Sequence, residues 1–207
     1  MSGSDIKAEF VEADLNAADN ASVAQADQPN TDFTIDGTDA SGGVATFSAA
    51  RILTATTAGT GDGAKTVTIT GTDLDGNTIT ETITLPGSAT TTAGTKYFKT
   101  VTAAEISAQP AADVSLGHAA GAADLVYAGR SRLKGAFIVN GATAGVITFL
   151  TNGADGTEVF KLGTVASATA ERDVTIPEQG LLFEQGIYIT YQGGTNEVFT
   201  NMTVFRA

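Results

Sequence analysis

Residues 66–85 read TVTITGTDLDGNTITETITL, and they contain two runs in which threonine alternates with valine, isoleucine or leucine. A period of two places the apolar side chains on one face of a strand, and β-branched residues suit a pleated, half-buried surface. Between the runs stands Asp75-Gly76, a dipeptide typical of tight turns between antiparallel strands. The stretch therefore predicts a β-hairpin with one buried face.

Similar patterns recur along the chain from about residue 31 onward. They predict further strands at 32–36, 43–48, 51–57, 96–107, 133–139, 145–151, 157–163, 172–177, 186–192 and 197–206. Short strands separated by turn signals are typical of sandwiches and small barrels. The expected fold class is all-β, with two small antiparallel β-sandwich or jelly-roll-like domains and an extended N-terminal arm.

The composition changes along the chain and indicates domain boundaries. We expect an acidic N-terminal arm at 1–30, a first β-domain at 31–108, an Ala/Gly-rich linker at 109–128 and a second β-domain at 129–207. Residues 1–50 hold nine acidic residues and one lysine. The arm either docks on a neighbouring subunit or is a floppy acidic tail, and the residues alone leave both readings open.

Charge and residue usage exclude several classes of function. The 207 residues include 11 basic and 23 acidic side chains, for a net charge of −12, which disfavours nucleic acid and anionic membranes as partners. There is no cysteine and one histidine, so a disulfide framework, a cysteine nucleophile and a Cys-based metal site are excluded. We expect no cofactor. No signal peptide or membrane span is recognisable, so the chain is expected to be made in the cytoplasm.

The turn of the first hairpin resembles the beginning of a calcium loop. Asp73, Asp75 and Asn77 have the spacing of the first three ligands of such a loop. The pattern then requires glycine at the sixth position and glutamate at the twelfth, where this chain has Thr78 and Thr84. A hairpin turn is therefore the favoured interpretation, and an incidental calcium ion at Asp73 and Asp75 stays open.

The sequence offers no recognisable catalytic constellation. His118 lies in the Ala/Gly-rich segment without an evident nucleophile, so we expect a surface or interface histidine. Two carboxylates are enough for a glycosidase, but the acidic residues are scattered and the chain has no tryptophan. We expect no enzymatic activity and no metal or cofactor site.

Two groups of residues are candidate partner contacts. Phe10, Val11 and Leu15 have the spacing of a short helical face within the arm. Arg130, Arg132 and Lys134 alternate along an expected strand and share a face. These cations are either a solvated strand face or a dock for an acidic surface, such as residues 1–30 of a neighbour.

Two segments carry a resemblance to known proteins. The first is TVTITGTDLDGNTITETI at 66–83, continued by TKYFKTV at 95–101. The second is LKGAFIVNGATAG at 133–145, continued by IPEQGLLF at 176–183 and GIYI at 186–189. Together they resemble structural proteins of tailed-phage virions, especially those of marine and cyanobacterial phages.

This resemblance implies a capsid decoration (cement) protein that binds the outer surface of the major capsid protein and stabilises the head. Such a protein would be found in the virion, and the local three-fold positions of a capsid imply a homotrimer. A tail-, baseplate- or fibre-associated structural protein is the alternative within the virion. A polysaccharide depolymerase is the alternative from another class, and the small size and missing tryptophan disfavour it.

Overall fold

The computed structural model describes residues 5–13, 17–26, 32–118, 123–192 and 198–207. These residues form sixteen strands and no helix, so the expected all-β, sandwich-like class is confirmed. The chain divides into two compact units. Unit 1 comprises Met1–Leu15 and Gly121–Ala207, and unit 2 comprises Asn16–Ala120.

Unit 2 is an antiparallel sheet folded around one hydrophobic core. Its strands are β2 (Ser22–Gln25), β3 (Ala40–Ser41), β4 (Val44–Thr57), β5 (Thr66–Thr72), β6 (Thr78–Thr84), β7 (Thr91–Ile106) and β8 (Val114–His118). Hydrogen-bonded neighbours follow the order β2-β8-β4-β7-β5-β6, and β3 pairs with β4. The long strands β4 and β7 carry register shifts, which are the positions where bulges bend a sheet.

The hairpin that the sequence predicts at 66–85 is confirmed residue by residue. Thr66 pairs with Thr84 and Thr72 pairs with Thr78, so the two strands are in register over their whole length. Val67 and Ile69 are fully buried, whereas the alternating residues Thr66, Thr68 and Thr70 are half-buried. The alternation in the sequence therefore marks the face that the core covers.

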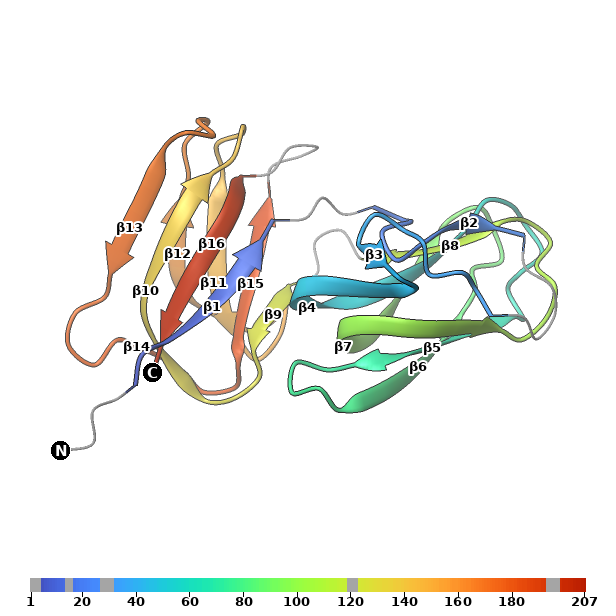
Figure 1. The fold of residues 1–207 in the computed structure, drawn as a ribbon, viewed down its shortest axis with the longest axis horizontal. Coiled ribbons are helices and arrows are strands. Elements are labelled where there is room, and N and C mark those ends of the chain that lie inside the picture. Colours follow the sequence, from blue (N-terminus) through green and yellow to red (C-terminus); the bar gives the residue numbers. More distant parts are fainter. Residues whose placement is uncertain (1–4, 14–16, 27–31, 119–122, 193–197) are drawn as a thin grey trace. The chain divides into compact units, whose positions relative to one another are not determined.

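Unit 1 is a two-layered β-sandwich. Its strands are β1 (Lys7–Glu12), β9 (Asp124–Tyr127), β10 (Ser131–Asn140), β11 (Val146–Thr151), β12 (Thr157–Gly163), β13 (Glu171–Thr175), β14 (Leu181–Phe183), β15 (Ile187–Gln192) and β16 (Phe199–Arg206). One layer has the order β1-β16-β10-β13, with β14 on β10, and the other has the order β12-β11-β15-β9 (Figure 1). Phe149, Phe183 and Phe199 are fully buried in this unit.

The predicted arm, linker and first strand require correction. Residues 7–12 are not part of a projecting arm, because β1 pairs with β16, and residues 22–25 pair with β8 in unit 2. The segment 109–128 is not only a linker, because it contains β8 and β9. The expected strand at 32–36 is reduced to a single bridge between Asp32 and Glu105.

Candidate functional site

One outer surface of unit 1 carries a group of apolar side chains. In the β1-β16-β10-β13 layer, the side chains that alternate with the buried core residues point away from the core. The apolar members of this outer set are Ile6, Ala8, Phe10, Phe137, Val139 and Phe205, and we call them the apolar face; Thr203 lies among them, and Lys134, Glu12 and Asp173 lie on the same side of the layer. The exposed fractions of Ile6 and Phe10 are 59% and 53%, respectively, which is high for large hydrophobic side chains.

Strand register brings the members of the apolar face together. Phe10 and Phe137 both pair with Thr203, one from each side of β16. Phe205 lies two residues further along β16, opposite Ala8. Phe205 is therefore a diagonal neighbour of both Phe10 and Phe137, while Thr203 separates the latter two.

A groove of about 370 Å³ opens at one end of the apolar face. Ile6 and Phe205 line it together with Lys134, Gly135 and residues 173–175 of β13. Acidic residues flank the surface: Glu12 follows Phe10 on β1, and Asp173 pairs with Phe137. The site thus combines apolar side chains with a polar rim that holds both acidic residues and Lys134, and an apolar centre with a polar rim is the general composition of a protein-binding surface.

An ion pair holds β1 in place at the edge of the layer. The Arg206 guanidinium donates a hydrogen bond from Nε to Oε1 of Glu9 at 2.7 Å. The same guanidinium lies 3.5 Å from the centre of the Tyr127 ring, a geometry in which a cation and an aromatic face attract each other. Residues near the two ends of the chain therefore meet in one sheet.

The first predicted contact group is separated by the structure. Phe10 belongs to the apolar face, whereas Val11 points into the core and is 1% exposed. Leu15 lies outside the described residues. The prediction that Phe10 and Val11 share a helical face is therefore wrong. This segment is a strand, and neighbouring side chains of a strand point to opposite faces.

The second predicted group, the three basic residues, is bound largely to its own chain. Arg130 forms an ion pair with Glu184 at 2.7 Å, and this hydrogen bond raises the pKa of the guanidinium. Lys134 donates to the backbone carbonyl of Glu178 at 2.6 Å, and Arg132 donates to that of Gly180 at 3.4 Å. Of the three, Lys134 alone is among the residues that line the groove.

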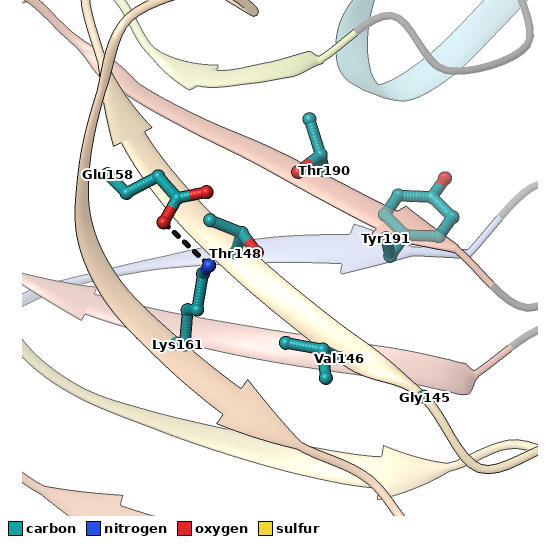
Figure 2. A pocket seen from close by; sticks show the side chains of 7 residues that line it. All are labelled: Gly145, Val146, Thr148, Glu158, Lys161, Thr190 and Tyr191. Carbon is teal, nitrogen blue, oxygen red and sulfur yellow. Dashed lines mark ion pairs between the residues drawn. The ribbon is translucent and has the colours of Figure 1, made fainter.

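The opposite layer of unit 1 carries a polar hollow of about 540 Å³. Its lining residues are Gly145, Val146, Thr148, Glu158, Lys161, Thr190 and Tyr191. Figure 2 shows the Glu158 and Lys161 side chains meeting on one side of Thr148, with Tyr191 on the other. The ion pair measures 2.6 Å, and each of its side chains is 55% exposed.

Three of the side chains in this hollow have interaction partners, namely Glu158, Lys161 and Tyr191. Glu158 and Lys161 neutralise each other's charge, and the Tyr191 hydroxyl donates to Oδ2 of Asp124 at 3.0 Å. The Tyr191 ring also packs edge-on against Phe199, with ring centres 4.9 Å apart.

The expectation for His118 is wrong in one respect, because this histidine is buried. It is 4% exposed on β8, and its Nε2 accepts a hydrogen bond of 2.9 Å from Arg51. The Phe47 ring packs edge-on against the imidazole at 6.0 Å. The lone pair of Nε2, which a general base would use, is already bound to Arg51, so this contact points to a structural role.

The turn at Asp73 uses its carboxylate internally. Oδ1 of Asp73 accepts hydrogen bonds from the backbone N–H groups of Asp75 and Asn77, each at 2.9 Å. The hydrogen bond from the Asn77 side chain is the main cause that lowers the pKa of Asp73 below 3.8. Within the described ranges there is no group of three or more histidine and acidic side chains positioned to hold a metal ion.

Comparisons with known proteins give no match: no protein family, no curated protein and no solved structure is significantly similar to this chain. In the described part of the chain there is also no helix long and apolar enough to cross a membrane.

Proposed function

We propose that this chain is a structural component of a tailed-phage virion, a capsid decoration protein that docks on the outer surface of the major capsid protein. The apolar face of unit 1 is the observation that carries the docking role. The segments at 66–101 and 133–189, which resemble virion proteins, support the choice of the capsid as the partner.

The physical basis of docking is burial of the apolar face. Ile6 and Phe10 are more than half exposed in the single chain, and covering a large apolar side chain contributes about 1.5–3 kcal/mol. Phe137 and Phe205 extend the same surface across β10 and β16. A partner that covers these side chains gains affinity without any reaction taking place.

The charge of the chain favours a partner of a particular kind. The net charge is −12, and the acidic residues Glu12, Glu171 and Asp173 are exposed beside the apolar face. A complementary partner surface presents apolar side chains surrounded by lysine or arginine. Packaged DNA is an unfavourable partner, because it is strongly anionic.

The first test is the copy number of this chain relative to the major capsid protein in purified virions, measured by quantitative mass spectrometry. A decoration protein is expected at hundreds of copies per particle. A dozen copies or fewer would place the chain in the tail, baseplate or fibre and overturn the capsid assignment.

The second test locates the docking surface. Phe10→Ser and Phe205→Ser are expected to weaken binding to heads that lack this chain by about 10- to 100-fold each, which corresponds to the burial of one aromatic side chain. Val165→Ser is the matched control, since Val165 is 52% exposed in the same unit but outside the apolar face. Equal binding by all three variants would contradict docking through this face.

A further inference from the structure

The strand β1 forms one edge of its layer, and half of its backbone groups point outward. β1 pairs with β16 on one side, and no other strand of the described chain pairs with it. Ala13 donates its N–H to Thr200, so the odd-numbered residues direct their backbone groups toward β16. Because these directions alternate along an antiparallel strand, the N–H and C=O groups of Ile6, Ala8 and Phe10 point away from the sheet.

An open edge of this kind binds another strand unless something blocks it. The strand has no proline, and its outer face carries Ala8, Phe10 and Glu12, with Ile6 just before it. Its other face carries Lys7 and Glu9, edge charges that oppose pairing unless the added strand places opposite charges against them. Two of the five large hydrophobic side chains that are exposed in the described residues, Ile6 and Phe10, belong to this short segment.

The edge is complementary to itself in one register. When a second copy pairs antiparallel with Ala8 opposite Ala8, the two exposed hydrophobic side chains Ile6 and Phe10 of opposite copies come together on the outer face. In the same register Lys7 lies opposite Glu9 on the other face. Opposite charges and apolar pairs at directly opposed positions stabilise neighbouring strands.

The neighbouring registers are less favourable. A shift by two residues in one direction places Glu9 opposite Glu9 and Ile6 opposite Glu12, which sets like charges against each other and an apolar side chain against a carboxylate. A shift by four residues places Ala8 opposite Glu12. A shift by one residue would turn the outer side chains of one copy toward the core side of the other.

We propose that two copies of this chain pair antiparallel through β1 about a two-fold axis at Ala8, so that their β1-β16-β10-β13 layers form one continuous sheet. The pairing supplies about six intermolecular backbone hydrogen bonds from Ile6, Ala8 and Phe10 of the two copies. It joins the two apolar faces into one surface of twice the area. The pairing itself does not depend on the proposed function. Only the role of the joined apolar surface in capsid docking rests on it.

The contact covers residues 6–10 of each copy and is smaller than a standard interface of about 1,600 Å². We therefore expect a dimer that dissociates on dilution. This two-fold pair differs from the trimer that the virion resemblance implies. Sedimentation velocity of the full chain over a range of concentrations separates the two: a monomer–dimer equilibrium supports the pairing, and a trimer or a monomer at every concentration overturns it.

Disulfide cross-linking tests the register. The native chain has no cysteine, and Cα atoms of hydrogen-bonded antiparallel partners lie about 5.5 Å apart, within the range of a disulfide. Ala8→Cys is expected to form a disulfide-linked dimer with oxidised glutathione, and an equal mixture of Ile6→Cys and Phe10→Cys chains is expected to form the mixed dimer. Phe10→Cys alone and the exposed control Val165→Cys are expected to cross-link at least about tenfold more slowly. Faster linkage of Phe10→Cys alone than of Ala8→Cys would overturn this register.

Ala8→Pro tests the role of the outward backbone. The backbone N–H of Ala8 points away from β16. Replacing Ala8 with proline removes this N–H, and with it intermolecular hydrogen bonds, but leaves the pairing of β1 with β16 intact. We expect an unchanged melting temperature and a dimer dissociation constant raised about tenfold or more. An unchanged dissociation constant in a folded Ala8→Pro chain would contradict the pairing. All of these measurements use the isolated protein. A negative result for pairing through β1 is therefore distinguishable from a negative result for capsid binding.

Discussion

Arg51 and His118 form a buried hydrogen bond of 2.9 Å between the guanidinium Nη1 and the imidazole Nε2. Arginine only donates hydrogen bonds, so Nε2 must be the acceptor and the imidazole carries its proton on Nδ1. The two side chains are 2% and 4% exposed, and Oδ2 of Asp39 lies 3.9 Å from the same Nε2. A buried guanidinium depends on such partners, because an uncompensated charge is costly in the core.

Removal of this acceptor is expected to destabilise unit 2. His118→Phe keeps the ring volume but offers no acceptor to Arg51, so the free energy of unfolding should fall by about 1–3 kcal/mol. His118→Gln keeps an acceptor oxygen and should lose less. Urea denaturation of the two variants checks the order, and a His118→Phe chain as stable as the native one would show that Arg51 does not depend on this bond.

The buried carboxylate of Asp62 is expected to make the free energy of unfolding fall in acid. Its side chain is fully buried, and Oδ1 accepts hydrogen bonds from Nζ of Lys65 and from the backbone N–H of Ala111, both at 2.7 Å. Burial by itself raises the pKa of Asp62, but the hydrogen bonds and the charge of Lys65 outweigh it, so the pKa lies below the ordinary 3.8.

The sign of the pH effect follows from this direction. A carboxyl group whose pKa is lower in the folded than in the unfolded chain stabilises the fold above the unfolded pKa, and this contribution is lost as the pH falls through the folded pKa. Asp62→Asn should therefore lower the free energy of unfolding at pH 7 by about 1.5–3 kcal/mol and should flatten its decrease below pH 3.8. Denaturant titrations from pH 7 to pH 2 check both effects, with the exposed Asp155→Asn as the control. Parallel pH curves for the native and Asp62→Asn chains would contradict the assignment.

Gly71 is predicted to tolerate no side chain. A Cβ atom at this position of β5 would collide with the backbone carbonyl oxygen of Thr100 on β7. Gly71→Ala should therefore force the two paired strands apart and cost about 1–3 kcal/mol. Gly87→Ala is the control, because the nearest atom to its Cβ would be Cα of Gly63 at 3.7 Å. Thermal unfolding compares the two, and equal melting temperatures would refute the predicted collision.

Calcium is expected to leave the turn at Asp73 unchanged. The Asp73 carboxylate already accepts hydrogen bonds from the backbone of Asp75 and Asn77, so a cation would have to displace them. We expect the same melting temperature with calcium and with a chelator. A higher melting temperature in calcium that disappears in Asp73→Ala would establish an ion site at this turn.

The local β-structure could be predicted from the sequence because its cause is local. In residues 66–85 the period of two, the β-branched side chains and the Asp75-Gly76 turn all specify the same hairpin, and the register of β5 on β6 follows from them. The same pattern located β10, β11, β12, β15 and β16 to within a few residues.

The apolar face could not be predicted, because it depends on which distant segments become neighbours. Phe10 gave no strand signal in an acidic, alanine-rich context, and its place follows from pairing with Thr203 near the other end of the chain. The alternation correctly placed Arg132 and Lys134 on one strand, whereas Arg130 precedes that strand. The contact of β10 with the turn at 178–180 binds Arg132 and Lys134 to their own chain. His118 lacks a local partner in the sequence, and only the pairing of β8 with β4 brings it to Arg51.

The sequence by itself thus determined the fold class and the buried face of the predicted strands, since alternation and turn chemistry act between near neighbours. The tertiary structure decided that residues 7–12 complete the sandwich of unit 1, that Phe10 is exposed while Val11 is buried, and that β1 forms an open edge. These outcomes depend on contacts between residues almost two hundred positions apart. The alternation of neighbouring residues does not specify which distant segments pair.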